Sequence, residues 1–180
     1  MKYSPMLLAC AVLAACSPAG EKSSAPMSHA ADTGQHLPEV PLVIHHRDGR
    51  PATRLSIEIA LGQEEQELGL MHRTDLKPGD GMVFPMIPAR MPNFWMKDTP
   101  TPLDVLFIAL DGRVVRVIAN AKPNDKTPLF AEQPVAGVLE LRGHDAARLG
   151  IREGDAIAWG ACTAEAASEP SVKPDSFCPA

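Results

Sequence analysis

Two acidic side chains, Asp104 and Glu140, lie inside strongly apolar stretches of the sequence, each with leucine or valine on both sides. Two carboxyl groups in unlike environments can have pKa values far enough apart to divide the roles of general acid and general base. The pair is therefore a candidate for hydrolysis of a glycan, provided that the groups lie about 5–10 Å apart across a cleft. Alternatively, backbone amides or an arginine such as Arg73 or Arg142 hold each carboxylate, because a buried charge needs partners.

A second candidate site lies in the segment 93–104, which holds one of the two tryptophans, a Lys–Asp pair and two prolines. The Trp95 ring offers a stacking face of the kind that sugars use, and Lys97 and Asp98 could bind an anionic or polyol ligand. If the segment is a strand, adjacent side chains point to opposite faces, so Trp95 and Lys97 share one face. We expect these two to form the wall of a ligand site, with Asp98 and Arg73 as further candidates. The alternative places Trp95 in the core and Lys97 in solvent.

Methionines are concentrated in residues 82–96, and thioethers are soft ligands that select Cu(I). His72 and Trp95 could complete such a site, although methionines more often fill irregular gaps in a core. The sequence contains no GxSxG, phosphate-binding glycine loop, HExxH or zinc spacing, so we expect no cofactor and no metal. The four methionines concerned are Met82, Met86, Met91 and Met96.

Residues 1–16 have the features of an export signal: Lys2 is followed by an apolar run too short to span a bilayer. The run ends in Leu-Ala-Ala-Cys, which resembles the bacterial lipobox, so Cys16 is expected to be acylated, for example with palmitate. The alternative is an ordinary secretory signal that is cut near Ala19. The sequence therefore predicts a periplasm-facing lipoprotein of the bacterial cell envelope. The outer membrane is slightly favoured, because Ser17 stands where an inner-membrane retention signal would have Asp.

The charge balance and the remaining cysteines fit this location. The chain has 17 Lys and Arg against 22 Asp and Glu, a net charge of −5, and no basic stripe. This argues against nucleic acid as a partner. Cys162 and Cys178 are expected to pair, because thiols of exported proteins tend to oxidise. Such a disulfide would close a loop of about 15 residues and stabilise the fold by roughly 3 kcal/mol. The alternative is two free thiols in a frayed tail.

Short β-type runs separated by Gly and Pro dominate the middle of the chain. Asp48-Gly49 and Asp111-Gly112 each lie between two runs, a strong hairpin signal because glycine tolerates positive φ. Helical spacing occurs at 63–71 and 143–149, and the run at 103–110 is apolar on both faces, as in a central strand. These features predict a mainly-β fold, a single-domain β-sandwich or partly closed barrel with two short helices. Strands are expected at 40–46, 53–60, 81–86, 103–110, 113–119, 134–141 and 155–159.

The organisation along the chain follows from composition. Residues 17–39 are rich in Ser, Ala, Gly and Pro and predict a flexible tether between the lipid and the domain. The segment 40–160 is long enough for one domain with a single core. Residues 161–180 are poor in apolar side chains and predict a C-terminal tail.

A series of ordered motifs resembles the family called domain of unknown function 192, over about residues 55–159. The resemblance implies a mainly-β sandwich or barrel, and it brings no established activity and no catalytic residues. Most members have Asn where this chain has Asp98. The motifs are Glu64-Glu65-Gln66-Glu67-Leu68-Gly69-Leu70-Met71-His72-Arg73, Gly81-Met82-Val83-Phe84, Phe94-Trp95-Met96-Lys97, Thr99, Pro102-Leu103-Asp104, Phe107, Asp111-Gly112, Val138-Leu139-Glu140-Leu141, Gly150-Ile151 and Gly154-Asp155.

The leading hypothesis is a lipid-anchored envelope protein whose β domain binds a small or extended ligand, such as a saccharide or cell-wall material, near Trp95. The alternatives are a glycan-directed hydrolase that uses Asp104 and Glu140, a Cu(I)-binding protein, and a purely structural or partner-binding lipoprotein.

Overall fold

The computed structural model describes Met1 and residues 34–163, 171–173 and 175–179, with the backbone alone at 171–173. The predicted signal peptide, the acylation site Cys16 and most of the predicted tether lie outside the described residues. The described residues from 34 onward belong to one unit of the chain. No helix among the described residues has the length and hydropathy needed to cross a membrane.

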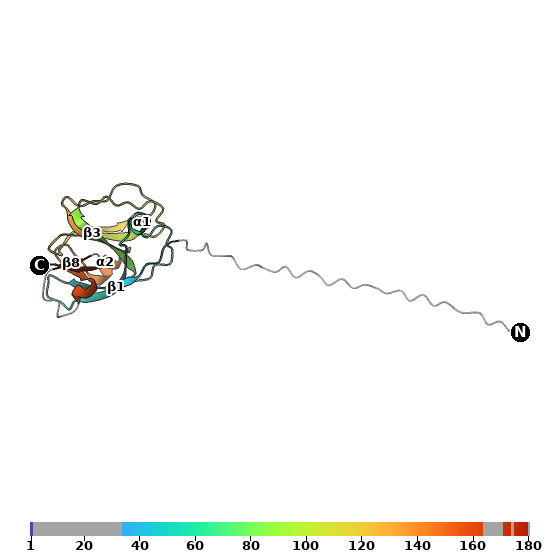
Figure 1. Cartoon of the computed structure of the whole chain (residues 1–180), viewed down its shortest axis with the longest axis horizontal. Coiled ribbons are helices and arrows are strands. Elements are labelled where there is room, and N and C mark those ends of the chain that lie inside the picture. The colour runs from blue at the N-terminus through green and yellow to red at the C-terminus, as the bar shows by residue number, and fades with distance from the viewer. Residues whose placement is uncertain (2–33, 164–170, 174, 180) are drawn as a thin grey trace. The chain divides into compact units, whose positions relative to one another are not determined.

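Nine strands, two short α-helices and one 3₁₀ helix make up the described part of the domain (Figure 1). The helices are α1 (Gln63–Leu68), α2 (Asp145–Leu149) and η1 (Gly160–Thr163). The strands are β1 (Glu39–His45), β2 (Thr53–Ile59), β3 (Gly81–Arg90), β4 (Leu103–Ile108), β5 (Val114–Ala121), β6 (Val135–Arg142), β7 (Ala156–Trp159), β8 (Ser171–Lys173) and β9 (Ser176–Cys178).

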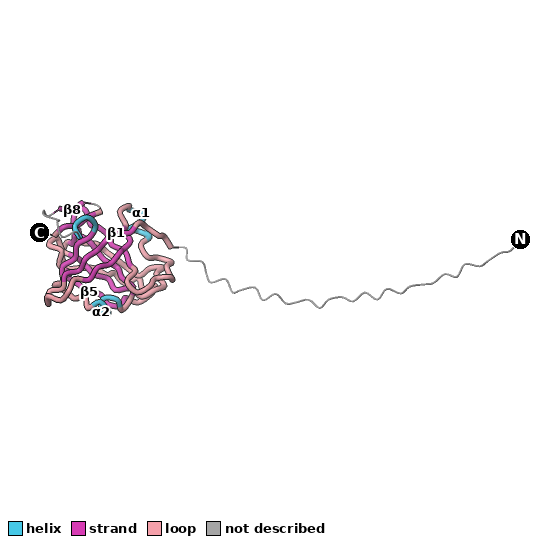
Figure 2. The backbone as a smooth tube through the Cα atoms, turned by 90° about the horizontal axis from the view of Figure 1, so that it is seen from below, coloured by secondary structure: helices cyan, strands magenta, loops and turns pink. Residues whose placement is uncertain are grey.

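All nine strands belong to one sheet, in the order β5-β4-β6-β3-β2-β1-β7-β9-β8. The sheet curves so that the start of β5 meets β7: Arg113 and Ala156 form an isolated bridge. The backbone N–H of Ile157 donates to the carbonyl of Gly112 at 2.8 Å. The prediction of a mainly-β domain, a sandwich or partly closed barrel with two short helices, is confirmed. In Figure 2 the two helices lie at opposite edges of the strands.

The central strands β4 and β6 divide the core into two apolar clusters. Side chains alternate across a strand, so Leu106 and Ile108 of β4 join one cluster and Val105 and Phe107 join the other. Every residue of β4 is buried, which confirms the predicted central position of this strand. Because β4 has apolar neighbours on both faces, any polar side chain on it or on β6 faces a water-poor environment.

The predicted turns form as expected. Gly49 and Gly112 have φ of 78° and 79°, the left-handed conformation for which glycine is best suited. Strand β3 is longer than predicted. It continues past Pro85 to Arg90, with a register shift against β6 between those two residues. An irregularity of this kind accommodates a proline that a regular ladder would exclude.

Both predicted ends of the domain differ from the structure. The Gln35 side chain donates to the carbonyls of Glu65 and Gly69 at 2.7 and 3.0 Å, so the fold begins within the segment predicted as tether. At the other end, β9 pairs with β7. Phe177 is fully buried and stacks on Trp159 with ring centroids 4.6 Å apart. The last part of the predicted tail is therefore part of the sheet.

The predicted disulfide is present. It joins Cys162 of η1 to Cys178 of β9, with the two Cα atoms 5.0 Å apart. The bond fastens the final strand to the segment that follows β7, beside the Trp159–Phe177 stack.

Candidate functional site

An open cleft of about 1270 Å³ lies beside α1. Its walls come from α1, from β3 and from the loop that follows β3, and one residue of β6, Glu140, also lines it. Several apolar side chains on these walls are exposed to solvent. Leu61, Ile87, Trp95 and Met91 are 46, 45, 48 and 58 % exposed, respectively. The cleft therefore offers apolar surface and one nearly buried carboxyl group.

Glu140 is only 5 % exposed and has apolar neighbours on both sides. Its register partners are Met82 of β3 and Val105 of β4, and both are fully buried. Among the described residues, none forms a hydrogen bond or ion pair with the Glu140 carboxyl. Burial raises the pKa of this carboxyl to about 8, because desolvation disfavours the charged form. At neutral pH most molecules therefore carry a neutral carboxylic acid here.

Trp95 is presented to the cleft by the residues on either side of it. The N–H groups of Phe94 and Met96 donate to the carbonyls of Leu129 and Asp125, at 2.9 and 2.8 Å. Met96 is buried, whereas Trp95 between these anchors faces outward. The segment is a loop with a single bridge at Phe94, not the strand that the argument about its two faces had assumed. The alternation of buried and exposed side chains that motivated the prediction is nevertheless present around Trp95.

Lys97 lines the cleft together with Trp95. Its Nζ is 5.9 Å from the centroid of the Trp95 ring, a cation–π contact, and 3.4 Å from Oδ2 of Asp98. Thr99 also lines the cleft, and its hydroxyl donates to the carbonyl of Lys97 at 3.0 Å, which fixes the turn. The wall therefore combines an aromatic face with an ammonium group.

Helix α1 also lines the cleft and is tied to β3 through Gln66. The amide of Gln66 donates to the carbonyl of Pro85 at 3.0 Å and accepts from Nη2 of Arg90 at 3.1 Å. Glu64 and Glu67 of α1 also line the cleft. The ionisable groups that line the cleft are thus Glu64, Glu67, Arg90, Lys97 and Glu140. Gln66 and Arg90 were not among the site residues predicted from the sequence. The mixture of Glu and Gln in the first family motif was the available signal.

Asp104 does not belong to the cleft and does not pair with Glu140. In the register of β4 against β6, Asp104 opposes Leu141 and Val105 opposes Glu140. Residues opposite one another share a face, so Asp104 and Glu140 point to opposite faces of the sheet. Both oxygens of Asp104 accept backbone N–H groups at 2.7 Å, one from Asn120 and one from Ala146. The acid–base pair predicted for a hydrolase therefore does not form, and backbone amides hold Asp104 instead.

Arg73, a predicted ligand-binding residue, is an internal ion-pair partner. It is 3 % exposed, and its guanidinium lies 2.9 Å from Glu58 and 2.8 Å from Asp75. It also donates to the carbonyl of Gln35, which attaches the start of the domain. Arg73 is not among the residues that line the cleft, so this arrangement is structural.

Asp98 lies next to the cleft wall without lining it. Its backbone has a φ of 51° and its carbonyl accepts the N–H of His72 at 2.8 Å. Asn and Asp are the residues besides glycine that best tolerate this left-handed conformation. The replacement of the family's usual Asn by Asp is thus compatible with the backbone conformation.

The methionines proposed for copper lie mainly in the core. Met82, Met86 and Met96 are at most 3 % exposed and belong to one apolar cluster, whereas Met91 is exposed at the cleft. Packing accounts for the three buried side chains. Among the described residues, His, Cys, Asp and Glu side chains do not form a group of three or more that could hold a metal ion.

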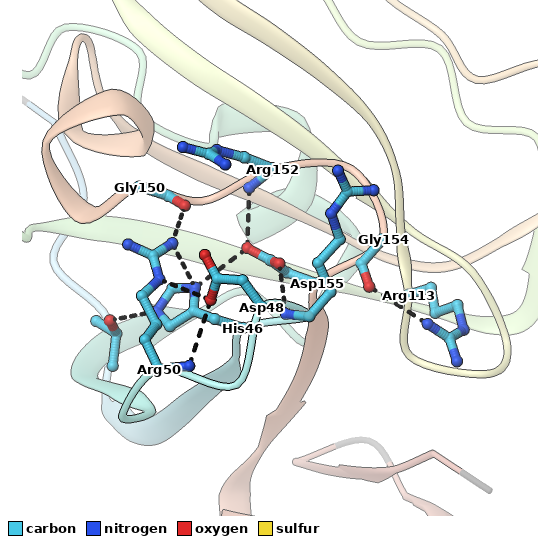
Figure 3. Close-up of polar contacts among 10 residues, drawn as sticks. His46, Asp48, Arg50, Arg113, Gly150, Arg152, Gly154 and Asp155 are labelled. Carbon is cyan, nitrogen blue, oxygen red and sulfur yellow. Dashed lines mark hydrogen bonds and ion pairs between the residues drawn. The ribbon is translucent and has the colours of Figure 1, made fainter.

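A second buried polar group, which the sequence analysis did not find, lies where β1 leads into its hairpin (Figure 3). Asp155 accepts the N–H groups of Arg47 and Arg152 at 3.0 and 2.9 Å and lies 3.2 Å from Nδ1 of His46. The other ring nitrogen of His46 is 2.8 Å from the Thr53 hydroxyl. Burial acts to raise the pKa of Asp155, but these hydrogen bonds outweigh it and lower the pKa.

An Asp–His–Thr arrangement of this kind could orient a hydroxyl nucleophile. Here, however, Asp155 connects the loop after β1 to the loop before β7. Arg50 reaches both Nδ1 of His46, at 2.9 Å, and the carbonyl of Gly150. Nδ1 can either donate to Asp155 or accept from Arg50, and one nitrogen cannot do both at once, so these two contacts are alternatives. The cleft described above is lined by other residues.

The fold and the cleft define a small β domain with one deep carboxyl group in an aromatic-walled cavity. Residues 43–159 match the model of the family DUF192, described as an uncharacterised ACR, and the chain belongs to this family. No match to the chain was found among the curated proteins.

Two solved structures are similar to this chain over most of the domain. A protein of unknown function from Novosphingobium aromaticivorans DSM 12444 is 42 % identical, with a TM-score of 0.64 over 76 % of this chain and 94 % of that one. A Sinorhizobium meliloti 1021 protein, described as a candidate transcription regulator, is 35 % identical, with a TM-score of 0.66 over 70 % of this chain and 98 % of that one.

Proposed function

We propose that this protein is a lipid-anchored protein of the bacterial envelope whose β domain binds a small or extended ligand in the cleft beside Trp95. The observation that carries the binding function is the cleft itself, which is lined by both a solvent-exposed tryptophan and a nearly buried carboxyl that has no hydrogen-bond partner among the described residues. Clefts in which polar groups converge beside apolar and aromatic side chains are typical of ligand sites. Saccharides or other cell-wall material are the favoured ligands.

The Trp95 wall supports this ligand class. A half-exposed indole provides a flat apolar face, and Lys97 beside it provides N–H donors. An apolar face flanked by donors complements a sugar ring, which has apolar C–H faces and hydroxyls around its edge. A core tryptophan would be buried like Trp159, which is 1 % exposed.

Fluorescence and calorimetry with oligosaccharides derived from peptidoglycan test the binding function. In a Trp159→Phe background, Trp95 is the only tryptophan of the chain, so a bound sugar should shift its emission. Trp95→Ala should weaken binding by about tenfold, because it removes the stacking surface. A verified oligosaccharide ligand that binds Trp95→Ala with unchanged affinity would contradict the site assignment.

The lipid anchor is supported by the lipobox-like sequence that ends at Cys16. Labelled palmitate fed to a bacterial host should enter the wild-type protein and not Cys16→Ala. Cys10→Ala is the matched control, because Cys10 lies within the signal segment and should leave labelling unchanged. Equal labelling of the Cys16→Ala variant and the wild type would contradict anchoring at this residue.

A further inference from the structure

We infer that Glu140 is the specificity-determining residue of the cleft: its carboxyl group exchanges hydrogen bonds with a hydroxyl group of an uncharged, polyhydroxylated ligand. This inference rests on the proposed function, because it assumes that the cleft binds a ligand. It adds the chemical class of the ligand group that contacts Glu140.

The geometry around Glu140 provides the first argument. The side chain is more than nine-tenths buried, lines the cleft and lies between Met82 and Val105 on the neighbouring strands. Within the described part of the chain, its carboxyl forms no hydrogen bond with the protein, and its oxygens are not fully closed off from solvent. Buried polar groups are almost always paired, and one that is not demands an explanation. A ligand that enters the cleft can supply the missing partner.

The chemistry of a neutral carboxylic acid provides the second argument. It has one O–H donor and keeps acceptor capacity on its oxygens. A hydroxyl group of the ligand can accept from that O–H and donate to the carbonyl oxygen, so one group satisfies both needs. An ammonium group would instead require Glu140 to ionise among apolar neighbours, where desolvation opposes the charge. Among the other charged groups that line the cleft, Lys97 and Arg90 would repel a cationic ligand, whereas Glu64 and Glu67 would attract it.

Binding of this kind depends on pH with a definite sign. The neutral acid is the binding form, and the pKa of Glu140 in the free protein is raised to about 8. Affinity should therefore be constant below neutral pH and fall by about thirtyfold between pH 6 and pH 9.5, since the neutral fraction falls by that factor. A ligand held by ionised Glu140 would show the opposite trend.

Three probes of matched size test the class of ligand on the full-length protein in detergent that carries no sugar. They are the uncharged tetramer of N-acetylglucosamine, its deacetylated and N-trimethylated counterpart, which stays cationic at both pH values, and the anionic tetramer of galacturonic acid. Calorimetry at pH 6 and pH 9.5 should show that the uncharged tetramer binds most tightly. Its affinity should show the fall with pH.

Variants at Glu140 separate its role from that of the rest of the cleft. Glu140→Gln keeps a donor and an acceptor and cannot ionise, so it should bind the uncharged tetramer at pH 6 within about threefold of wild type and lose the pH dependence. Glu140→Leu should lose about tenfold or more in affinity at pH 6. Glu64→Gln, on the rim, is the matched control and should keep the fall in affinity with pH.

The outcomes distinguish this inference from the proposed function. Binding that Trp95→Ala weakens, but that is independent of pH and unchanged in Glu140→Leu, overturns the inference and leaves the proposed function standing. Preferred binding of the cationic tetramer, rising with pH and lost in Glu140→Gln, also overturns the inference alone. Failure of all three probes to bind, with no change in Trp95 emission, overturns both.

Discussion

Two buried carboxyl groups in this domain have opposite surroundings. Asp155, 1 % exposed, accepts two backbone N–H groups and contacts His46 (Figure 3). These hydrogen bonds overcome the effect of burial and lower its pKa. Glu140, 5 % exposed, has no such partner among the described residues, and burial raises its pKa to about 8. Burial alone therefore does not single out a candidate site residue. What distinguishes Glu140 is that it lines a cleft and forms no hydrogen bond with the described residues.

Asp104 belongs with Asp155 in this comparison. Both of its oxygens accept backbone N–H groups at 2.7 Å, and it is completely buried. Asp104 and Asp155 join strands to loops and helices, so they stabilise the scaffold. Glu140 stabilises nothing that the structure describes. The comparison thus separates groups that hold the fold from one that is available to a ligand.

The largest expected effect comes from Glu140, which should make the domain less stable as the pH rises. Its pKa in the fold is about 8, against 4.5 in the unfolded chain, so the folded state binds more protons between these values. Stability should then be highest below pH 4.5 with respect to this group and fall by up to about 5 kcal/mol by pH 8. Urea unfolding from pH 5 to pH 9 measures this. Glu140→Gln should flatten the curve, and an equally steep curve in that variant would exclude Glu140 as the cause.

Removing Asp155 should destabilise the domain by about 2–3 kcal/mol, since Asp155→Ala leaves the backbone N–H groups of Arg47 and Arg152 without their acceptor and removes the contact with the buried His46 ring. Thermal and urea unfolding at pH 7 provide the measurement. Because the pKa of Asp155 is lowered, its contribution to stability should be present above the ordinary Asp range and be lost as the pH falls. A loss below about 1 kcal/mol would mean that Asp155, like Glu140, contributes little to stability, and would contradict the contrast between the two carboxyl groups.

Replacing Glu140 with an apolar residue should raise the free energy of unfolding, in contrast to the loss expected for Asp155→Ala. Glu140→Leu should stabilise the domain by about 1–3 kcal/mol at pH 7, because it removes an unpaired polar group from apolar surroundings. Asp104→Leu is the matched control and should be destabilising, since it removes the acceptor for two backbone N–H groups. Destabilisation by both substitutions would mean that Glu140 has a structural partner after all.

The smallest expected effect is that of Trp95. Trp95→Ala should change the free energy of unfolding by less than about 0.5 kcal/mol, because the ring is 48 % exposed. Trp159→Ala, which removes a buried ring stacked on Phe177, should destabilise by about 3–5 kcal/mol. A large loss of stability in Trp95→Ala would show that the wall of the cleft is part of the core.

The sequence predicted the fold well because the local signals and the tertiary structure agree. The hairpins at Gly49 and Gly112 and the fully buried strand β4 were all predicted from pattern. The last strand was not, because Phe177 is an isolated apolar residue whose burial depends on pairing with Trp159 across the sheet.

The candidate site was predicted in part. Trp95 and Lys97 were placed on a shared wall by their alternation, although the segment is a loop. Glu140 was identified by its apolar flanks, and so was Asp104. Their separation follows from the register of β6 against β4, where Glu140 opposes Val105. Nothing in the sequence reports such a register, because it is set by pairing between distant segments.

The most direct test of the account is the titration of Glu140 itself. Carboxyl ¹³C NMR of the full-length protein, with Glu140→Gln to assign the resonance, measures its pKa in the absence of any ligand. We expect a pKa of about 8 for Glu140, because its carboxyl is buried and forms no hydrogen bond with the described residues. Titration in the ordinary range of glutamate, near 4.5, would mean that water or a protein group solvates the carboxylate, and would contradict the central claim.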